Sequence, residues 1–135
     1  MQKIEKLFDI NIVLMTLFSS LETIRDHKKI ELIYDMEATI PRELRGDPTV
    51  LLRLLTKMLT FVLENTDRKE IVLSLGAPED FLYEELMSFK IEETNIPKEK
   101  ILEFLETNLS KDLEILEGKI VYEKDADIHL DIPFK

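Results

Sequence analysis

The sequence has no cysteine, no tryptophan and only three glycines among 135 residues. The absence of cysteine excludes a disulfide scaffold, thiol catalysis and cysteine-bound metals. The glycines, at positions 46, 76 and 118, are too few and too dispersed to form a glycine-rich loop around a phosphate group. Long apolar runs are also missing, since residues 10–18 fall well short of the roughly 20 apolar residues that cross a bilayer. We therefore expect a soluble, cytoplasmic chain that does not enter a membrane.

Negative charge dominates the C-terminal part of the chain. The formal net charge is −10, and residues 76–135 contain no arginine. Binding to DNA or RNA requires a basic face, so the composition argues against a nucleic-acid partner. The same field would repel an anionic nucleotide from this half of the chain. The hydrophobic fraction of 44% is sufficient for one folded domain, which we place over residues 1–135.

The spacing of apolar residues predicts a mixed order of helices and strands. The predicted helices cover residues 8–27, 48–63 and 97–117, and the predicted strands cover residues 30–36, 69–75, 81–91, 119–124 and 127–134. Helices and strands are segregated enough to predict a two-layer α/β sandwich, in which a mixed β-sheet has helices packed on one face.

Several residues have the chemistry that begins or ends a helix. Asp9 and Asp47 can each accept hydrogen bonds from amides of a first helical turn, and Pro48 suits the first helical position. Ser110 could cap a separate final helix, and Gly118 is the expected helix stop.

Residues 40–66, IPRELRGDPTVLLRLLTKMLTFVLENT, resemble a segment of a known family. Ile40-Pro41, Leu44 and Gly46-Asp47 match its strand-ending turn, and the leucines that follow match the apolar frame of its buried helix. The segments FDINIVLMTLFSSLETI, EGKIVYEK and IHLDIPF match its opening helix and closing hairpin. Over residues 7–134 the chain thus resembles the ATPase domain of histidine kinases, a branch of the GHKL superfamily, which also contains Hsp90-type chaperones, the ATPase part of DNA gyrase and MutL.

The residues that bind ATP in that family are replaced in this sequence. Two helix asparagines of the family, the second of which holds magnesium, fall on Lys57 and Phe61, and phenylalanine offers no oxygen to the ion. The adenine-binding loop corresponds to residues 91–97, which contain no glycine. Only residues 98–117 remain for both a helix and the lid over the phosphates, so we expect the ATP lid to be deleted. The resemblance therefore implies no bound magnesium-ATP, no other cofactor, no metal and no catalytic residue.

Two alternatives remain for the degenerate pocket. A divergent nucleotide-binding enzyme could use Glu92 or Glu93 in place of the family's adenine-binding aspartate, and it would need an open space beside Phe61. Any nucleotide would then meet the positions Lys57, Phe61, Glu92, Glu93, Thr94 and Asn95. Phe61 is more simply interpreted as an aromatic that fills the vacated adenine site, although an apolar pocket for another ligand is the functional alternative.

The remaining titratable residues give no pattern of a catalytic or metal site. His27 is expected to be a solvated residue at a helix end, and His129 alternates with apolar residues on a strand and should point outward. Neighbouring residues on a strand face opposite sides, so neither Glu84-Glu85 nor Glu92-Glu93 converges on a cation or a substrate.

The sequence therefore predicts a non-catalytic interaction module of bacterial two-component signalling. By the family resemblance, its partner would be a response-regulator receiver or a kinase, with the contact near residues 95–112. Arg42, Arg45 and the group Arg25-His27-Lys28-Lys29 provide the only basic area expected for an acidic partner. A homodimer is left open, and so is a role as the C-terminal fragment of a longer histidine kinase or phosphotransfer protein.

Overall fold

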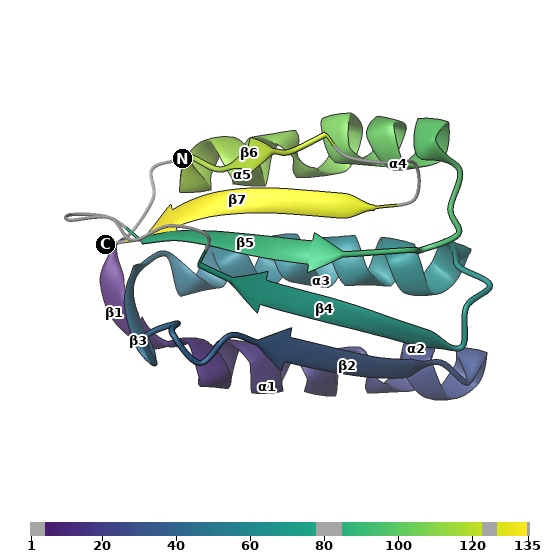
Figure 1. The fold of residues 1–135 in the computed structure, drawn as a ribbon, viewed down its shortest axis with the longest axis horizontal. Helices are drawn as coiled ribbons and strands as arrows, with labels where there is room; N and C mark the ends of the chain where they lie inside the picture. The colour runs from purple at the N-terminus through teal and green to yellow at the C-terminus, as the bar shows by residue number, and fades with distance from the viewer. Residues whose placement is uncertain (1–4, 78–84, 123–126, 135) are drawn as a thin grey trace.

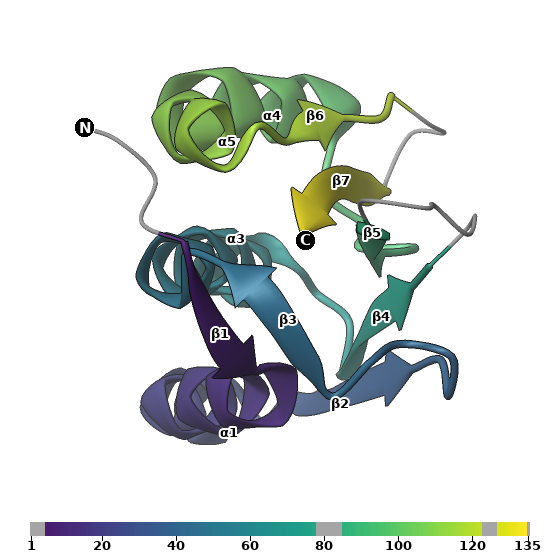
Figure 2. The ribbon, with the colours of Figure 1, turned by 90° about the vertical axis from the view of Figure 1, so that its left-hand side faces the viewer.

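The computed structural model describes residues 5–77, 85–122 and 127–134, and its main feature is a five-stranded mixed sheet. The strands lie in the order β2 (Glu31–Met36), β4 (Glu70–Gly76), β5 (Glu85–Ile91), β7 (Ile128–Phe134) and β6 (Lys119–Ile120). β2 pairs with β4 in parallel, and the other neighbouring pairs are antiparallel. Helices cover one face of this sheet (Figures 1 and 2). The predicted architecture is therefore confirmed.

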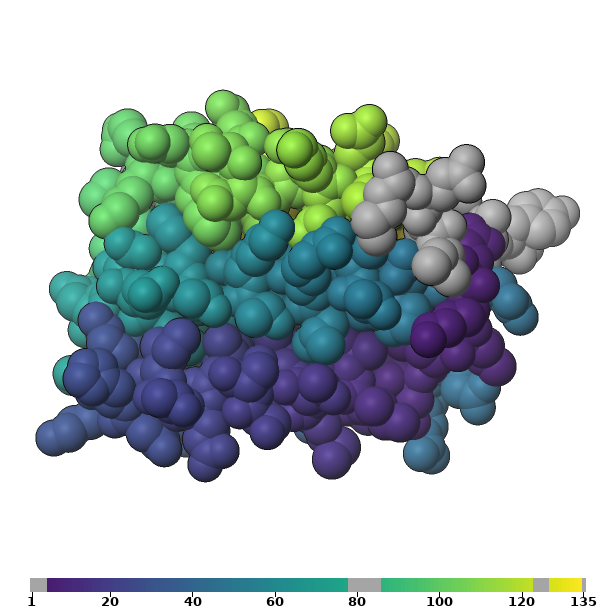
Figure 3. Space-filling model, turned by 180° about the vertical axis from the view of Figure 1, so that it is seen from behind, coloured from purple at the N-terminus to yellow at the C-terminus, as the bar shows by residue number. Residues whose placement is uncertain are grey.

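The helices form three rows when the molecule is seen from the side away from the sheet (Figure 3). One row holds α1 (Ile10–Ser20) and α2 (Glu22–Lys28), the middle row is α3 (Pro48–Asn65), and the last holds α4 (Lys98–Phe104), the π-helical segment η1 (Leu105–Leu109) and α5 (Ser110–Leu116). α3 is therefore covered by a helix row on either side and by the sheet below it.

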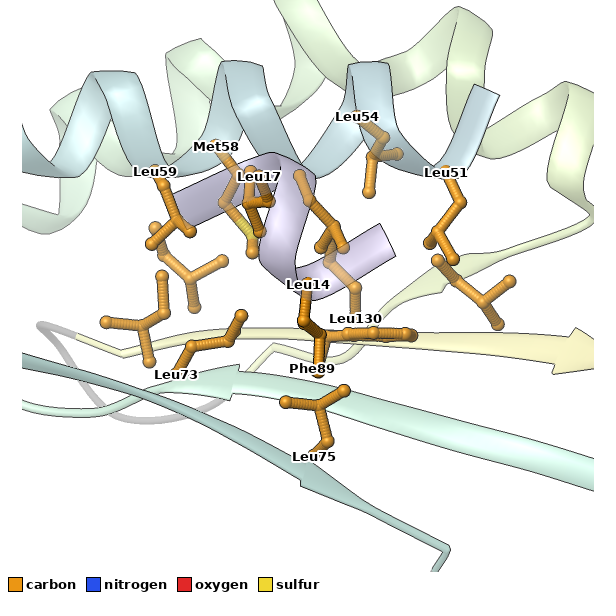
Figure 4. Close-up of a cluster of buried hydrophobic side chains, with 14 of the residues drawn as sticks. Leu14, Leu17, Leu51, Leu54, Met58, Leu59, Leu73, Leu75, Phe89 and Leu130 are labelled. Carbon is orange, nitrogen blue, oxygen red and sulfur yellow. The ribbon is translucent and has the colours of Figure 1, made fainter. Parts of the chain in front are cut away.

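The core lies between α3 and the sheet. Eight side chains of α3 are buried, which confirms that this helix is enclosed on most sides: Val50, Leu51, Leu54, Leu55, Met58, Leu59, Val62 and Leu63. Figure 4 shows α3 leucines together with Leu14 and Leu17 of α1 above Phe89 of β5 and Leu130 of β7. Strand β7 alternates between buried and half-buried residues along its length, as expected when one face of a sheet packs on a core.

Both predicted aspartate caps are confirmed. Oδ1 of Asp9 accepts a hydrogen bond from the Asn11 amide at 2.8 Å, and Oδ1 of the buried Asp47 accepts one from the Val50 amide at 3.1 Å. Pro48 is the first residue of α3, where a missing amide proton has no cost.

A second, two-stranded sheet was not predicted. β1 (Lys6–Asp9) pairs antiparallel with β3 (Glu43–Gly46) at one end of the molecule (Figure 2). The helix predicted over residues 8–27 is correspondingly shorter at its start, because residues up to Asp9 belong to β1, and it is interrupted at Leu21. Four-residue strands contain too few residues to show an alternating pattern, so the local sequence does not reveal them.

The end of the last helical region differs from the prediction. Ser110 is the first residue of α5 but makes no capping hydrogen bond, because the chain enters α5 directly from η1. The left-handed residue after the helix is Glu117, with φ of 59°, and not Gly118. Gly118 is instead needed for close packing, since a Cβ there would lie 2.9 Å from Cδ2 of Leu113 and 3.1 Å from Cγ1 of Ile132.

The remaining boundaries agree with the sequence within a few residues. The strand predicted over 81–91 begins at Glu85, and residues 81–84 lie outside the described residues. The two strands of the predicted terminal hairpin pair as β6 and β7, and residues 123–126 also lie outside the described residues. Within the described ranges, none of the helices has the length and apolar character needed to cross a membrane.

Candidate functional site

The two positions that the resemblance aligns with asparagines, Lys57 and Phe61, contact the last helical row separately. Lys57 and Phe61 lie one turn apart on α3. The ring of Phe61 stacks on Phe104 of α4, with centroids 4.1 Å apart and planes at 9°. Both rings are half-buried against the core. One face of the Phe61 ring is therefore covered by Phe104.

The loop that follows β5 keeps two left-handed residues without any glycine. Glu93 has φ of 54° and Asn95 has φ of 60°. Between them, Thr94 is completely buried, and its carbonyl accepts a hydrogen bond from Oγ1 of Thr66 at 2.6 Å. Oγ1 of Thr94 also accepts a hydrogen bond from the Ile96 amide at 3.2 Å. Buried hydrogen bonds thus hold this loop against the end of α3.

The charged side chains of the loop are directed to separate partners. Glu92 and Glu93 are exposed, and the Glu93 carboxylate lies 3.3 Å from Nη1 of Arg68. Nδ2 of Asn95 donates to Oδ1 of Asp67 at 3.1 Å. Four of the six predicted pocket positions each contact a different neighbour: Lys57, Phe61, Glu93 and Asn95. These contacts therefore do not bring the six positions together around one cavity.

Replacing Glu93 by glycine is expected to raise the free energy of unfolding by about 0.5–1 kcal/mol, because a left-handed backbone strains any residue that has a Cβ. The exposed ion pair with Arg68 contributes little that would be lost. Glu92→Gly is the matched control, because Glu92 does not have a positive φ, and it should lower stability by about 0.5–1 kcal/mol. Urea unfolding of both variants measures the difference. Equal losses in the two variants would contradict the strain argument.

A groove of about 730 Å³ lies between α3 and the η1–α5 segment, at the seam between the teal and green rows of Figure 3. We call it the α3–α5 groove, and it is lined by Arg53, Lys57, Thr107, Asn108, Lys111, Asp112, Glu114 and Ile115. It includes Lys57 but none of the other predicted pocket positions.

A buried carboxylate at the groove joins two cations of α3 to α5. Oδ1 of Asp112 accepts hydrogen bonds from Nη2 of Arg53 at 2.7 Å and Nε at 3.1 Å, and Oδ2 accepts one from Nζ of Lys57 at 3.2 Å. Asp112 is only 2% exposed, whereas the side chains of Arg53 and Lys57 are 39% and 44% exposed. The two cations therefore pair with the buried acid on one side and face solvent in the groove on the other.

The pKa of Asp112 reflects this arrangement. Burial alone would raise the pKa, but the hydrogen bonds from Arg53 and Lys57 outweigh burial and hold the pKa of Asp112 below its usual value. The hydrogen bond to Asp112 likewise raises the pKa of Arg53. Asp112 and Arg53 are therefore both charged at neutral pH.

The lowered pKa of Asp112 makes stability depend on acid pH. The unfolded chain, with a pKa of about 3.9, binds this proton more tightly than the folded state, so the stabilisation is fully present above about pH 5 and is lost as the pH falls through the lower native value. We expect Asp112→Asn to show a smaller loss of stability between pH 5 and pH 3 than the wild type, measured by urea unfolding. Asp9→Asn is the control, because its partner Arg42 is largely exposed and the effect should be smaller. Identical pH profiles for wild type and Asp112→Asn would contradict the assignment.

The basic area predicted from the sequence is not one area. Arg42 and Arg45 lie at β3, near the start of α1 (Figure 1). Residues 25–29 lie at α2, which follows the other end of α1. Arg42 is also paired with Asp9, with Nε and Oδ2 2.8 Å apart. The prediction that these residues are the only basic area is wrong, because Arg53, Lys57 and Lys111 gather at the α3–α5 groove.

The sequence contains one signal for this groove that the prediction did not use. Asp112 is three residues after Leu109 and four before Leu116, so it occupies the apolar face of its helix. A carboxylate at such a position must be paired when it is buried. Its partners are 55 and 59 residues away in sequence and could not be identified from spacing.

The remaining candidate residues are the two histidines and the Glu84-Glu85 pair. His27 is exposed near the end of α2, as predicted. His129 lies on the uncovered face of the sheet, where its Nε2 is 2.9 Å from Oδ1 of Asp131, which also accepts a hydrogen bond from Ser88 at 2.6 Å. In residues 5–77, 85–122 and 127–134, no three histidine or acidic side chains converge as metal ligands. The Glu84-Glu85 side chains lie outside the described part of the structure.

Comparison with known proteins supports the fold. No family model matches the chain, and no curated protein matches it by sequence. Among solved structures, the histidine kinase AdeS of Acinetobacter baumannii matches with a TM-score of 0.73 and 16% identity, over 100% of this chain and 68% of that one. The nucleotide-free catalytic domain of histidine kinase ThkA matches with a TM-score of 0.70 and 18% identity, over 96% of this chain and 95% of that one.

A third solved structure adds a binding partner. Histidine kinase ThkA in complex with the response regulator protein TrrA matches with a TM-score of 0.69 and 18% identity, over 97% of this chain and 42% of that one. At these identities the similarity establishes that the chain has the fold of a histidine-kinase catalytic domain.

Proposed function

We propose that this chain is a non-catalytic domain of two-component signalling, which docks a response-regulator receiver or a kinase and does not bind magnesium-ATP. The observation that carries the proposal is the stack of Phe61 on Phe104, which covers one face of the Phe61 ring. The resemblance aligns Phe61 with the family's magnesium-binding asparagine, and phenylalanine offers no oxygen ligand to the ion.

The helical cover of residues 98–116 also supports the proposal. In this range α4, η1 and α5 follow one another without a loop, and Leu105, Leu109, Leu113 and Leu116 are buried. A mobile lid over a nucleotide would have to come from these residues, and moving them would expose apolar core. The buried leucines of this region are therefore part of the hydrophobic core.

The partner class is supported by the fold and by one neighbour. ThkA is a histidine kinase solved in complex with a response regulator, and this chain shares its fold. A domain that loses ATP chemistry but keeps such a fold keeps surfaces for contact with receivers or kinases. The chain is therefore assigned a binding role within that class of signalling proteins.

Isothermal titration of ATP and ADP, with and without magnesium, tests the proposal. We expect no saturable heat and no rise in melting temperature at millimolar nucleotide. The double variant Lys57→Asn with Phe61→Asn reinstates both asparagines and should still not bind, because helix replaces the lid. Saturable binding by the wild type, abolished by Glu92→Ala or Glu93→Ala, would instead establish the divergent nucleotide-binding enzyme. Titration of receiver and kinase domains from the same genome tests the partner class.

A further inference from the structure

We propose that the α3–α5 groove is the docking site for an acidic segment of the protein partner. This inference rests on the proposed function and names the surface and the chemistry of contact. The groove lies within the part of the surface near residues 95–112, but its cations come mainly from α3, which the sequence analysis did not connect with docking.

The cations of the groove have hydrogen-bonding capacity left after pairing with Asp112. Arginine carries five N–H donors and lysine carries three. Asp112 accepts from Nε and from one Nη2 proton of Arg53 and from one proton of Lys57, which leaves both Nη1 protons and the second Nη2 proton of Arg53 and two protons of Lys57 for a ligand. Lys111, exposed on the opposite wall, adds a third cationic group to the same groove.

The buried acid fixes the cations in advance of binding. A free surface lysine or arginine loses rotamer freedom when it binds, and this loss weakens binding. Arg53 and Lys57 are already held by hydrogen bonds to a carboxylate that is 2% exposed. Asp112 is therefore a positioning residue for the two side chains that would meet the partner.

Local charge favours an acidic occupant although the whole chain is acidic. At physiological ionic strength, charges separated by more than about 8 Å are largely screened, so the residues lining the groove decide the contact. The lining residues include three cations and two carboxylates, and one of the carboxylates, Asp112, is buried behind its partners. The buried Asp47, at the start of α3, also acts electrostatically on Arg53. Among the lining residues an incoming aspartate or glutamate meets an excess of one positive charge.

The shape and remaining lining fit a peptide segment better than a single ion. The volume of about 730 Å³ exceeds that of one small anion. The π-helical segment η1 presents the exposed Thr107 and Asn108 to the groove, and π-helical turns frequently occur at functional sites. Ile115, half-buried at the wall, offers an apolar contact next to the charges.

The test uses an acetylated peptide of alternating aspartate and glutamate, six residues long, titrated into the ¹⁵N-labelled protein. We expect amide shifts to concentrate at the α3–α5 groove and a Lys111→Glu variant to weaken binding about tenfold. The hydrogen bonds to Asp112 come from Arg53 and Lys57, so changing Lys111 should leave the fold intact. Lys98→Glu on α4 is the matched control, with the same charge change outside the groove, and should bind within about twofold of the wild type.

Three results of the peptide titration would overturn the inference. These are shifts spread over the surface, equal weakening by Lys98→Glu and Lys111→Glu, and equal saturation by inorganic phosphate, which would make the groove a site for small anions. A receiver or kinase that binds the wild type and Lys111→Glu equally well would also overturn it while leaving the proposed function intact. Saturable nucleotide binding, in contrast, would remove the proposed function itself.

Discussion

Replacing Arg53 and Lys57 together by methionine is expected to lower the free energy of unfolding by about 3–5 kcal/mol, because the carboxylate of Asp112 would remain buried without a partner. Methionine keeps most of the length of both side chains, so the loss reports the missing charges more than missing packing. Urea unfolding at neutral pH gives the value. The pKa of Asp112 should rise in the same variant, because burial is then unopposed.

The control for this prediction removes the acid as well. A triple variant that adds Asp112→Leu has no buried charge, and replacing a whole buried ion cluster by apolar residues is often neutral or stabilising. We expect the triple variant to recover most of the stability lost in the double variant. A double variant that loses less than about 1 kcal/mol would mean that water reaches Asp112 and that the cluster does not join the helices.

Replacing Phe61 by alanine is expected to cost about 2–3 kcal/mol of stability, less than for a fully buried phenylalanine because Phe61 is half-buried. The ring fills the space between α3 and α4 and stacks on Phe104. Thermal and urea unfolding measure the loss. We also expect the variant to remain unable to bind ATP, because Lys57 stays paired with Asp112 and the helical cover remains in place.

A double-mutant cycle separates the stack from ordinary packing. Phe61→Ala, Phe104→Ala and the double variant should give a coupling energy of about 0.5–1.5 kcal/mol, the range for offset or stacked aromatic pairs. Phe61→Leu is the matched control, since it keeps an apolar group in the space but removes the ring. Zero coupling, or a Phe61→Leu variant as unstable as Phe61→Ala, would contradict the role assigned to the stack.

The parts of the fold that could be predicted are those with local causes. Asp47 and Pro48 determine the start of α3 through one side-chain hydrogen bond and one fixed backbone angle, and both are adjacent in sequence. The buried faces of the long helices follow from apolar spacing. The correspondence of Lys57 and Phe61 with positions that bind magnesium-ATP came from the family resemblance and not from spacing, and it stays a prediction.

The parts that could not be predicted depend on contacts between distant residues. β1 and β3 are defined by pairing between Lys6–Asp9 and Glu43–Gly46, which no local pattern encodes. The capping role given to Ser110 fails because Leu105–Leu109 continue the helical backbone as a π-helix. The stack of Phe61 on Phe104 and the pairing of Arg53 with Asp112 likewise join residues that only the tertiary structure brings together.

The loop around Thr94 shows how contacts from outside a loop can decide its conformation. Its two left-handed residues are Glu93 and Asn95, and its path is held by Thr66 and by Asp127, whose Oδ1 accepts a hydrogen bond from the Glu93 amide at 2.9 Å. The backbone therefore adopts this path without any glycine, at a modest energetic cost. Hydrogen bonds to distant residues can in this way hold a loop in a conformation that its own residue types disfavour, so the number of glycines in a segment does not by itself determine the path of the backbone.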